Sequence, residues 1–250
     1  MDASAAAGII LTLEDVVSGY GKLTVLNGTS FQAARGAITT IIGPNGAGKS
    51  TVFKAVFGLL AVWSGRVVFD GREITNFGPR ALLELGISYV PQGRNIFPEL
   101  SVRHNLELGA TAAGKGVDVA ARIESLMDRF PVLRERAGAQ ASTLSGGQQK
   151  LLEIARGLLL EPKLMLIDEP SIGLSPRLVQ ETFDILRDLR AKGVSILMVE
   201  QNAKRALEIS DFGVVLELGR TRMAGAASAI LSDHRIGQLV LGGGLVPEAL

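Results

Sequence analysis

Residues 43–51 read Gly-Pro-Asn-Gly-Ala-Gly-Lys-Ser-Thr (GPNGAGKST) and directly follow the apolar, β-rich run AITTII. They match the pattern G-x-x-x-x-G-K-[ST], and a helical pattern follows at residues 48–60. Glycines allow such a loop to wrap its backbone amides around phosphate oxygens. The stretch therefore predicts a nucleotide phosphate-binding loop between a strand and a helix.

Two side chains of this loop have predicted roles. Lys49 supplies a flexible positive charge for the β- and γ-phosphates, and the Ser50 hydroxyl is a suitable magnesium ligand. An ordinary glycine-rich turn is the alternative, which the strand–loop–helix placement disfavours. The predicted ATP contacts in the loop are Gly43, Pro44, Asn45, Gly46, Ala47, Gly48, Lys49, Ser50 and Thr51.

A second buried strand should end in the acids that complete such a site. The run LMLIDEP places Asp168 and Glu169 directly after four apolar residues. Asp168 can hold magnesium, directly or through water, and Glu169 can polarise a water for in-line attack on the γ-phosphate. Acids also cap strand ends for structural reasons, but behind a phosphate loop we favour the catalytic interpretation.

The order of elements predicts an α/β fold with a mostly parallel sheet. Several of the β-rich runs are continuously apolar, as in strands covered on both faces. We expect strands at residues 9–17, 37–43, 65–70, 86–91, 164–168, 194–200 and 212–218, and helices at 48–60, 175–192 and 201–209.

Residues 102–160 break this alternation, because helical patterns dominate there and no strand is evident. Ile123, Leu126, Met127 and Phe130 follow the i, i+3, i+4, i+7 rule and form one apolar stripe. We therefore expect a helical lobe inserted into an α/β core. The expected parts are a core at 1–91 and 159–236, a lobe at 92–158 and an irregular tail at 237–250.

The amino-acid composition argues against several kinds of function. The 250 residues carry 26 basic and 25 acidic side chains, a net charge of +1 and no cysteine. That balance argues against a nucleic-acid partner, and the lack of cysteine excludes disulfides and Cys-ligated metals. We expect no export signal and no membrane span. A mean hydropathy of +0.29 fits a well-filled core better than apolar surface kept for partners, although both remain open.

A second anion-seeking helix start is predicted at residues 144–150, LSGGQQK. The apolar, helix-patterned run LLEIARGLLL follows it. Ser145 is the expected N-cap, and the two glycines after it leave backbone amides facing outward. Helix starts of this kind attract anions.

With LSGGQQK between the phosphate loop and LMLIDEP, the chain resembles the nucleotide-binding subunits of ABC transporters over nearly its whole length. The resemblance implies an ATP-hydrolysing P-loop NTPase (RecA-like) core that uses ATP and Mg²⁺, with an N-terminal antiparallel β region. It implies that Tyr20 stacks on adenine and that Gln92 links magnesium and the attacking water to the helical lobe. SIGLSP, residues 171–176, matches the loop that crosses the dimer interface but lacks the aspartate common there.

The resemblance also implies a second ABC ATPase subunit, either another copy or a LivG-type companion. In this family two subunits meet head to tail, and each ATP lies between the phosphate loop of one and the LSGGQ helix start of the other. Ser145, Gly146, Gly147 and Gln148 would then contact the partner's nucleotide.

One residue departs from the pattern usual in this family. Gln201 stands where most members place a histidine that contacts the γ-phosphate. Glutamine donates an amide hydrogen bond but cannot carry a proton or a positive charge. The site is therefore slower, or works through Glu169, or is specialised beside a histidine-bearing partner. We favour the second, because Glu169 and Lys49 are intact.

Together VEQNAKRAL and VPQGRNIFPELSVRHNL resemble the LivF-type ATPases of branched-chain amino acid importers. This likeness implies two membrane permease subunits, an extracytoplasmic solute-binding protein acting indirectly, and a peripheral position on the cytoplasmic face of the inner membrane. Ile96, Phe97 and Leu100 either line the permease cleft or root the helical lobe. The alternatives are a urea or other small-solute importer of the same branch, and a soluble ABC regulator with low turnover.

Overall fold

The computed structural model describes residues 8–113, 116–233 and 236, so the expected tail at 237–250 lies outside the described residues. Its strands are β1 (Ile9–Tyr20), β2 (Leu23–Ala34), β3 (Ile38–Ile42), β4 (Val62–Phe69), β5 (Arg72–Glu73), β6 (Ile87–Val90), β7 (Leu164–Asp168), β8 (Ser195–Val199), β9 (Phe212–Glu217) and β10 (Arg220–Ala226). Its α-helices are α1 (Lys49–Val56), α2 (Pro79–Leu85), α3 (Val102–Gly109), α4 (Val119–Arg129), α5 (Pro131–Glu135), α6 (Gly146–Leu158), α7 (Pro176–Ala191), α8 (Ala203–Glu208) and α9 (Ala227–Ser232). Short 3₁₀ turns are η2 (Ala110–Ala112) and η3 (Ala141–Thr143).

The strands form two sheets, as the α/β fold class requires. The larger has the order β10-β9-β3-β8-β7-β6, in which β9, β3, β8, β7 and β6 run parallel and β10 is an antiparallel edge. The smaller sheet, β2-β1-β4-β5, is antiparallel and contains the N-terminal strands. The expectation of a mostly parallel sheet beside an antiparallel N-terminal region is confirmed.

Strand β2 is absent from the strands expected from the sequence. It forms a hairpin with β1, in which Tyr20 pairs with Leu23. Its burial alternates only from Thr29 to Ala33, and the run LTVLNGTSFQAA holds several polar residues and a glycine. Pairing with β1 therefore stabilises a segment whose composition alone only weakly favours a strand.

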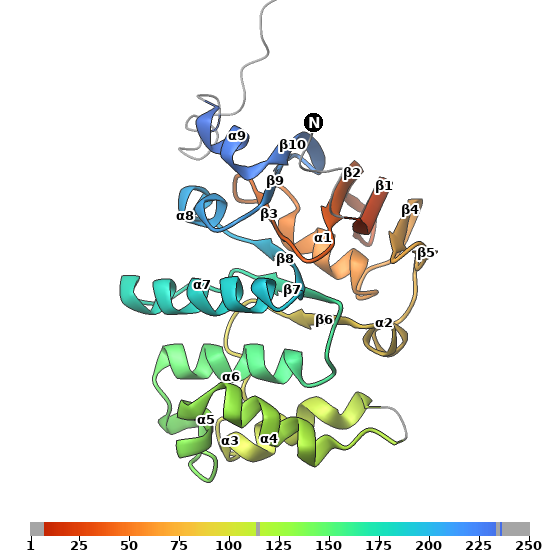
Figure 1. The fold of residues 1–250 in the computed structure, drawn as a ribbon. Helices are drawn as coiled ribbons and strands as arrows, with labels where there is room; N and C mark the ends of the chain where they lie inside the picture. The colour runs from red at the N-terminus through yellow and green to blue at the C-terminus, as the bar shows by residue number, and fades with distance from the viewer. Residues whose placement is uncertain (1–7, 114–115, 234–235, 237–250) are drawn as a thin grey trace, which may run out of the picture.

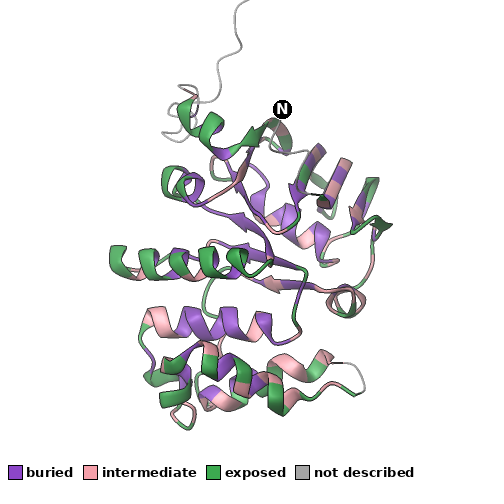
Figure 2. Cartoon of the chain, in the orientation of Figure 1, coloured by how far each residue is buried: buried purple, intermediate pink, exposed green. Residues whose placement is uncertain are grey.

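The central strands are apolar throughout because the larger sheet separates two cores. In β7, Leu164 and Leu166 face the core shared with the smaller sheet, whereas Met165 and Ile167 face the core shared with α6 and α7. Successive side chains of a strand point to opposite faces, so both faces of β7 need apolar residues. Figure 1 shows α6 and α7 on one side of the larger sheet and α1 with the smaller sheet on the other. Figure 2 shows the strands of the larger sheet between them as largely buried.

Helix α1 lies between the two sheets (Figure 1) and fixes the place of the phosphate loop that precedes it. Phe53 is fully buried on this helix. Its ring meets the ring of Tyr89 on β6 edge-on, with centroids 6.0 Å apart and an interplanar angle of 82°. These contacts anchor the helix whose first residues, Lys49 and Ser50, belong to the predicted nucleotide site.

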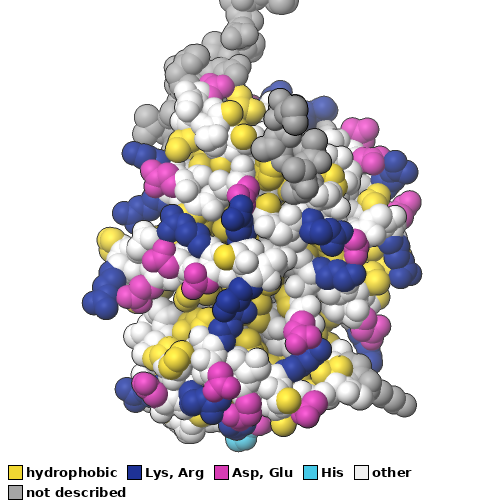
Figure 3. Space-filling model, in the orientation of Figure 1, with side chains coloured by type: hydrophobic (Ala, Val, Ile, Leu, Met, Phe, Trp, Pro, Cys, Tyr) yellow, Lys and Arg dark blue, Asp and Glu magenta, His cyan; other side chains and the backbone are white. Residues whose placement is uncertain are grey.

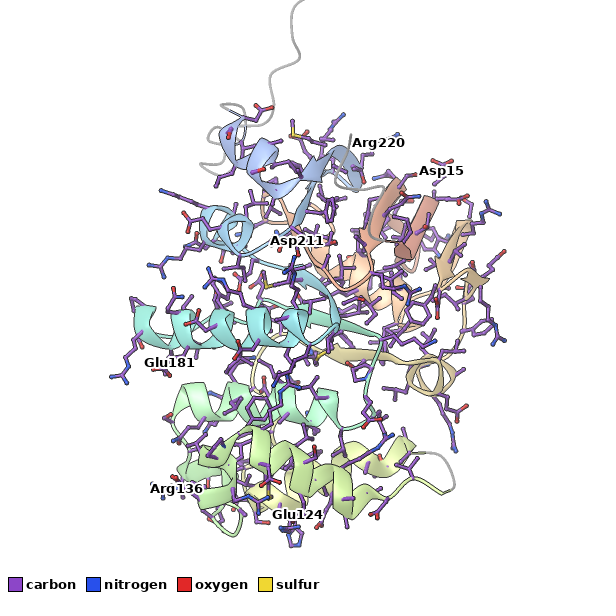
Figure 4. All side chains as sticks on the ribbon, viewed as in Figure 1. Asp15, Glu124, Arg136, Glu181, Asp211 and Arg220 are labelled. Carbon is purple, nitrogen blue, oxygen red and sulfur yellow. The ribbon has the colours of Figure 1, made fainter. Side chains whose placement is uncertain are left out.

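Among the described residues of 102–160, the structure has helices α3 to α6, two 3₁₀ turns and no strand, as expected. The predicted apolar stripe of α4 is buried, with Ile123 and Met127 at 1% and 0% exposure. At the lower end of the lobe in Figure 4, Glu124 accepts hydrogen bonds from Arg103 of α3 (2.6 Å) and Arg134 of α5 (2.9 Å). These two arginines hold the pKa of Glu124 below its usual value. The three short helices are thereby linked at their surface.

Helix α6 of the lobe runs beside α7, which packs on the larger sheet, and the exposure of the two helices differs. Most of α6 is buried, whereas α7 shows an exposed face along its length (Figure 2). The end of α7 is tied to the sheet through Asp211, labelled in Figure 4, which accepts from Arg190 Nε (3.1 Å) and from the backbone amide of Ile38 (2.9 Å).

The surface matches the small net charge. On the face shown in Figure 3, basic and acidic side chains are interspersed, and apolar side chains lie in the depressions between helices. None of the helices in the described ranges is both long and apolar enough to cross a membrane.

Replacing Phe53 by alanine is expected to lower the free energy of unfolding by about 3–5 kcal/mol, because it opens a cavity in the core between the two sheets. Chemical denaturation monitored by circular dichroism measures this loss. The matched control is Leu59→Ala just after α1, where the side chain is 52% exposed. Equal losses in the two variants would contradict the packing role of Phe53.

Candidate active site

The phosphate loop connects β3 to α1, and two of its glycines are required by geometry. Gly43 has φ 154°, and a Cβ there would lie 2.1 Å from the carbonyl oxygen of Leu216. Gly48 caps α1 with φ 100° and provides no side-chain cap for the helix. The first amides of α1 therefore lack a side-chain partner from the capping residue, which makes this helix start suited to an anion.

Lys49 is held at the mouth of the loop. Its Nζ donates to the carbonyl oxygens of Gly43 (2.9 Å) and Pro44 (3.0 Å). The side chain is buried, and this burial lowers the pKa of Lys49, although the charges of Glu169 and Asp168 oppose the shift. The lysine is thus fixed among the same groups that a triphosphate would approach.

Asp168 joins β7 to α1. Its Oδ1 accepts a hydrogen bond from Ser50 Oγ (3.2 Å), and its Oδ2 accepts one from the hydroxyl of Tyr89 (3.3 Å). The residue is only 2% exposed, and burial raises the pKa of the carboxyl although both hydrogen bonds lower it. Ser50 and Asp168 thus present two oxygen atoms side by side, and oxygen ligands are what Mg²⁺ prefers.

Glu169 occupies a strained position one residue further on. Its φ is 47°, which is rare for a residue with a side chain, and its amide donates to the carbonyl oxygen of Val199 (2.9 Å). Burial, and then the neighbouring charge of Asp168, raise the pKa of its carboxyl, whereas Lys49 lowers it. Oε2 accepts from Gln92 Nε2 at 2.9 Å. The structure therefore brings Gln92 and Glu169 together.

Gln201 lies in the same hollow as Glu169. This hollow has a volume of about 420 Å³ and is also lined by Ser171, Ile172, Glu200 and Asn202. Gln201 is exposed, and its backbone amide donates to Glu200 Oε2 (3.2 Å). The side-chain amide of Gln201 is therefore available beside Glu169.

Tyr20 is the last residue of β1. It is 44% exposed, and its hydroxyl accepts a hydrogen bond from Lys54 Nζ (3.2 Å) on α1. The ammonium also lies 5.5 Å from the ring centroid, within the range of a cation–π contact. An exposed aromatic ring is thus positioned by the helix that follows the phosphate loop.

The predicted N-cap of α6 is confirmed. Ser145 Oγ accepts from the amide of Gln148 (3.3 Å), and Gln148 Oε1 accepts from the amide of Ser145 (3.0 Å), which is a complete capping box. The Ser145 hydroxyl can still donate its own proton. A Cβ on Gly147 would lie 2.5 Å from a terminal methyl group of Leu178 on α7, so a larger residue there would require this side chain to move.

The α6 start lines a hollow of its own. This hollow measures about 510 Å³, contains Ser145, Gly147 and Gln148, and includes no residue of the phosphate loop. Within one chain, therefore, the two helix starts suited to anions line different surfaces.

Two residues of the site, Tyr89 and Glu200, were not predicted from the sequence. Tyr89 was unassigned, because only the sheet places its hydroxyl against Asp168. Glu200 is 1% exposed and accepts from both the amide (2.9 Å) and the hydroxyl (2.8 Å) of Ser171. Burial raises its pKa. The sequence pattern that could have predicted Glu200 is an acid directly after the apolar strand SILMV, the same pattern that predicted Asp168.

Comparison with known proteins identifies the class. A family model described as "ABC transporter" matches residues 26–172, and the chain belongs to this family. It is thus an ATP-binding cassette that hydrolyses ATP, and such ATP-binding subunits work with membrane permease components. The cassette in a solved structure described as the ADP conformation of an ABC transporter cassette has a TM-score of 0.86 at 31% identity, covering 94% of this chain and 99% of that one.

Among curated relatives, the chain is similar to the high-affinity branched-chain amino acid transport ATP-binding protein BraG of Pseudomonas aeruginosa. The two are 38% identical over 94% of this chain and 100% of BraG. It is 39% identical to a probable branched-chain amino acid transport ATP-binding protein, LivF, of Archaeoglobus fulgidus, over 90% of this chain and 95% of that protein. The lipopolysaccharide export ATP-binding protein LptB of Acidithiobacillus ferridurans is 32% identical, over 93% and 97%.

Replacing Asp168 by asparagine is expected to stabilise the fold at neutral pH, because it removes a buried carboxylate that must otherwise be charged. The folded pKa of Asp168 is raised, so ionisation opposes folding above that pKa. As the pH falls through the raised pKa, the folded protein binds the proton and the difference between variant and parent disappears. Thermal unfolding across this pH range measures the effect.

The matched control is Asp184→Asn on α7, where the side chain is 56% exposed. It should shift the unfolding temperature little at either pH. A stabilisation by Asp168→Asn that persists unchanged at low pH would contradict burial as its cause.

Proposed function

We propose that Lys49, Glu169, Gln92 and Gln201 carry out ATP hydrolysis at a site completed by a second cassette. The observation that carries this proposal is the cluster formed where β7 meets α1. Ser50 contacts Asp168 (3.2 Å), and Gln92 contacts Glu169 (2.9 Å), beside a buried lysine at the phosphate loop.

In this proposal Glu169 takes a proton from water as the water oxygen bonds to the γ-phosphorus. The bond from that phosphorus to the β–γ bridging oxygen breaks, and its electron pair leaves with ADP. The raised pKa of Glu169 makes it a stronger base than an ordinary carboxylate, and Gln92 holds one of its oxygens in place. Gln201 donates an amide hydrogen bond to the phosphate or the water.

Ser50, Asp168 and Gln92 would hold Mg²⁺, which neutralises phosphate charge. The donor set fits the ion, since a hydroxyl and a carboxylate oxygen lie together. Among the described residues, no group of three or more His, Cys, Asp or Glu side chains gathers in a way that could hold a metal ion. Magnesium of this kind completes its coordination with substrate phosphates and water, so a larger protein ligand set is not required.

The remaining ATP contacts follow from the same arrangement. Tyr20 would stack on adenine, and residues 43–51 would surround the phosphates. Ser145, Gly146, Gly147 and Gln148 would meet the nucleotide bound by the partner cassette, because in their own chain they line a separate hollow. The catalytic core would comprise residues 1–91 and 159–236, and the helical lobe residues 92–158.

We further propose that the cassette powers the import of leucine, isoleucine and valine. BraG and LivF support this proposal by their names and coverage, and Gln201 supports it by its sequence context. The chain would sit on the cytoplasmic face of the membrane with two permeases, a second ATPase subunit and, indirectly, a solute-binding protein. Urea or another small solute is the alternative cargo.

Isolation of the complex from its own membranes tests the cargo and the partners. Mass spectrometry would identify the co-purifying permeases, and reconstituted vesicles would report ATP-driven uptake of labelled leucine against labelled urea. Uptake of urea alone would overturn the amino acid assignment. A soluble regulator would show neither permeases nor stimulated phosphate release.

Glu169→Gln is expected to lower kcat roughly 10²- to 10⁴-fold, because the amide cannot accept the proton from water. Nucleotide binding should remain, since Lys49 and the phosphate loop are intact. Magnesium-dependent phosphate release and the binding of a fluorescent ATP analogue measure the two effects. The control is Glu84→Gln on α2, an exposed residue that pairs with Arg80. Unchanged turnover in the Glu169 variant would refute its role.

Phe97→Asp is expected to spare ATP binding and to weaken association with the permease. Phe97 is 47% exposed and lies under the Arg156 guanidinium at 5.6 Å, whereas its neighbour Ile96 packs against the lobe core. In this proposal Phe97 contacts the permease, and Ile96 attaches the segment to the core beneath it. Co-purification with the permeases measures the effect, with Leu231→Asp on α9 as the control. Undiminished recovery of permease would count against the contact.

A further inference from the structure

Helix α6 contains a buried ion pair that the proposed chemistry does not use. Lys150 Nζ and Glu153 Oε2 are 2.6 Å apart, and their side chains are only 6% and 2% exposed. Taking two charges out of water is costly, and apolar residues often replace such pairs without loss of stability. The pair therefore needs an explanation other than stability.

Both charges contact the segment that follows Gln92. Glu153 Oε1 accepts a hydrogen bond from the backbone amide of Asn95 at 2.5 Å. Lys150 Nζ donates to the carbonyl oxygen of Gly93 at 3.3 Å. Hydrogen bonds to ionised groups are about twice as strong as neutral ones, so the segment is firmly attached to α6.

The segment itself is a compact unit. Asn95 Nδ2 donates to the carbonyl oxygens of Pro91 (2.9 Å), Gln92 (3.3 Å) and Gly93 (3.3 Å), which closes residues 91–95 on themselves. A displacement of Asn95 or Gly93 would therefore shift Gln92 as well. Gln92 Nε2 in turn donates to Glu169 Oε2 at 2.9 Å.

These contacts form a continuous path from α6 to the proposed general base. The path runs from Glu153 to Asn95, through the closed segment to Gln92, and on to Glu169. The same helix begins at Ser145, the residue proposed to meet the partner's ATP. One rigid element is thus linked to a nucleotide in the partner at its start and to the base of its own chain two turns later.

We propose that Lys150 and Glu153 are a positioning pair that makes Gln92 move with α6, so that engagement of the α6 start by the partner's ATP places Glu169 for attack in this chain. This inference rests on the proposed function and adds to it the residues that connect the two nucleotides. Burial suits this task, because water would otherwise compete for the amide of Asn95.

Two double variants isolate the role. Both Lys150→Met/Glu153→Gln and Lys150→Met/Glu153→Leu remove the two charges together, so neither leaves an unpaired buried charge. Only the first keeps an acceptor for the amide of Asn95. We expect kcat of the leucine form to be roughly tenfold lower than that of the glutamine form, as for a misplaced catalytic group, with KM for ATP unchanged. Asp184→Asn, which breaks an exposed pair on α7, should match the parent.

A cycle with Gln92→Ala separates positioning from general loosening. In that background the two double variants should turn over equally, because the path to Glu169 is already broken. Should the leucine form fold poorly in thermal unfolding, Lys150→Met/Glu153→Met replaces it, because it also removes both charges and the acceptor oxygen, with kcat below that of the glutamine form expected when Gln92 is present and no difference from it in Gln92→Ala. Equal kcat of the double variants with Gln92 present, or an undiminished difference without it, would overturn the proposal.

The outcomes also distinguish the positioning role of Lys150 and Glu153 from the catalytic role of Glu169. Loss of turnover in Glu169→Gln together with equal double variants would reject the positioning pair and leave the proposed function standing. Full turnover in Glu169→Gln would reject the proposed catalytic assignment, whatever the double variants show.

Discussion

The hydrogen bond from Ser50 to Asp168 joins the start of α1 to the end of β7, and the candidate site is assembled around it. Helix α1 carries the phosphate loop and is anchored between two sheets by Phe53. Strand β7 ends in the acids and is paired on both edges by parallel neighbours. Because both partners are rigid, the hydroxyl and the carboxylate have little freedom to separate.

Several residues of the candidate site lower the stability of the folded protein. Burial disfavours the charged forms of Asp168, Glu200 and Lys49, as their shifted pKa values show, and Glu169 adds backbone strain. Such groups are kept apart from water by the apolar strands that end beside them. Perturbed ionisable groups gathered at one edge of a sheet are typical of sites that bind or transform a ligand. Apolar burial in the two cores of the larger sheet offsets this loss of folding stability.

The sequence predicted the parts of this site that depend on local chemistry. The phosphate loop, the N-cap of α6 and the acids after β7 each follow from short patterns with a physical cause. The continuous apolar strands likewise predicted a sheet covered on both faces. These features are set within a few residues, so one sequence was sufficient to find them.

The sequence could not show the contacts that depend on tertiary placement. Tyr89 reaches Asp168 only because β6 lies beside β7, and Glu200 reaches Ser171 only because β8 ends at the same edge. Strand β2 needs β1 as its partner. Ile96 and Phe97 are alike in composition, yet one packs inward and the other is exposed.

The separation of the two anion-suited helix starts has a consequence for the proposed dimer. In the proposed site one chain would surround only part of a triphosphate, because the hollow at Ser145 includes no residue of the phosphate loop. A second cassette arranged head to tail would supply the missing amides, and the γ-phosphate would then carry negative charge that both chains contact. Hydrolysis would remove that shared group and weaken the contact between the two chains. The attachment of residues 91–95 to α6 places the same event within reach of Glu169, so assembly and chemistry would depend on one helix.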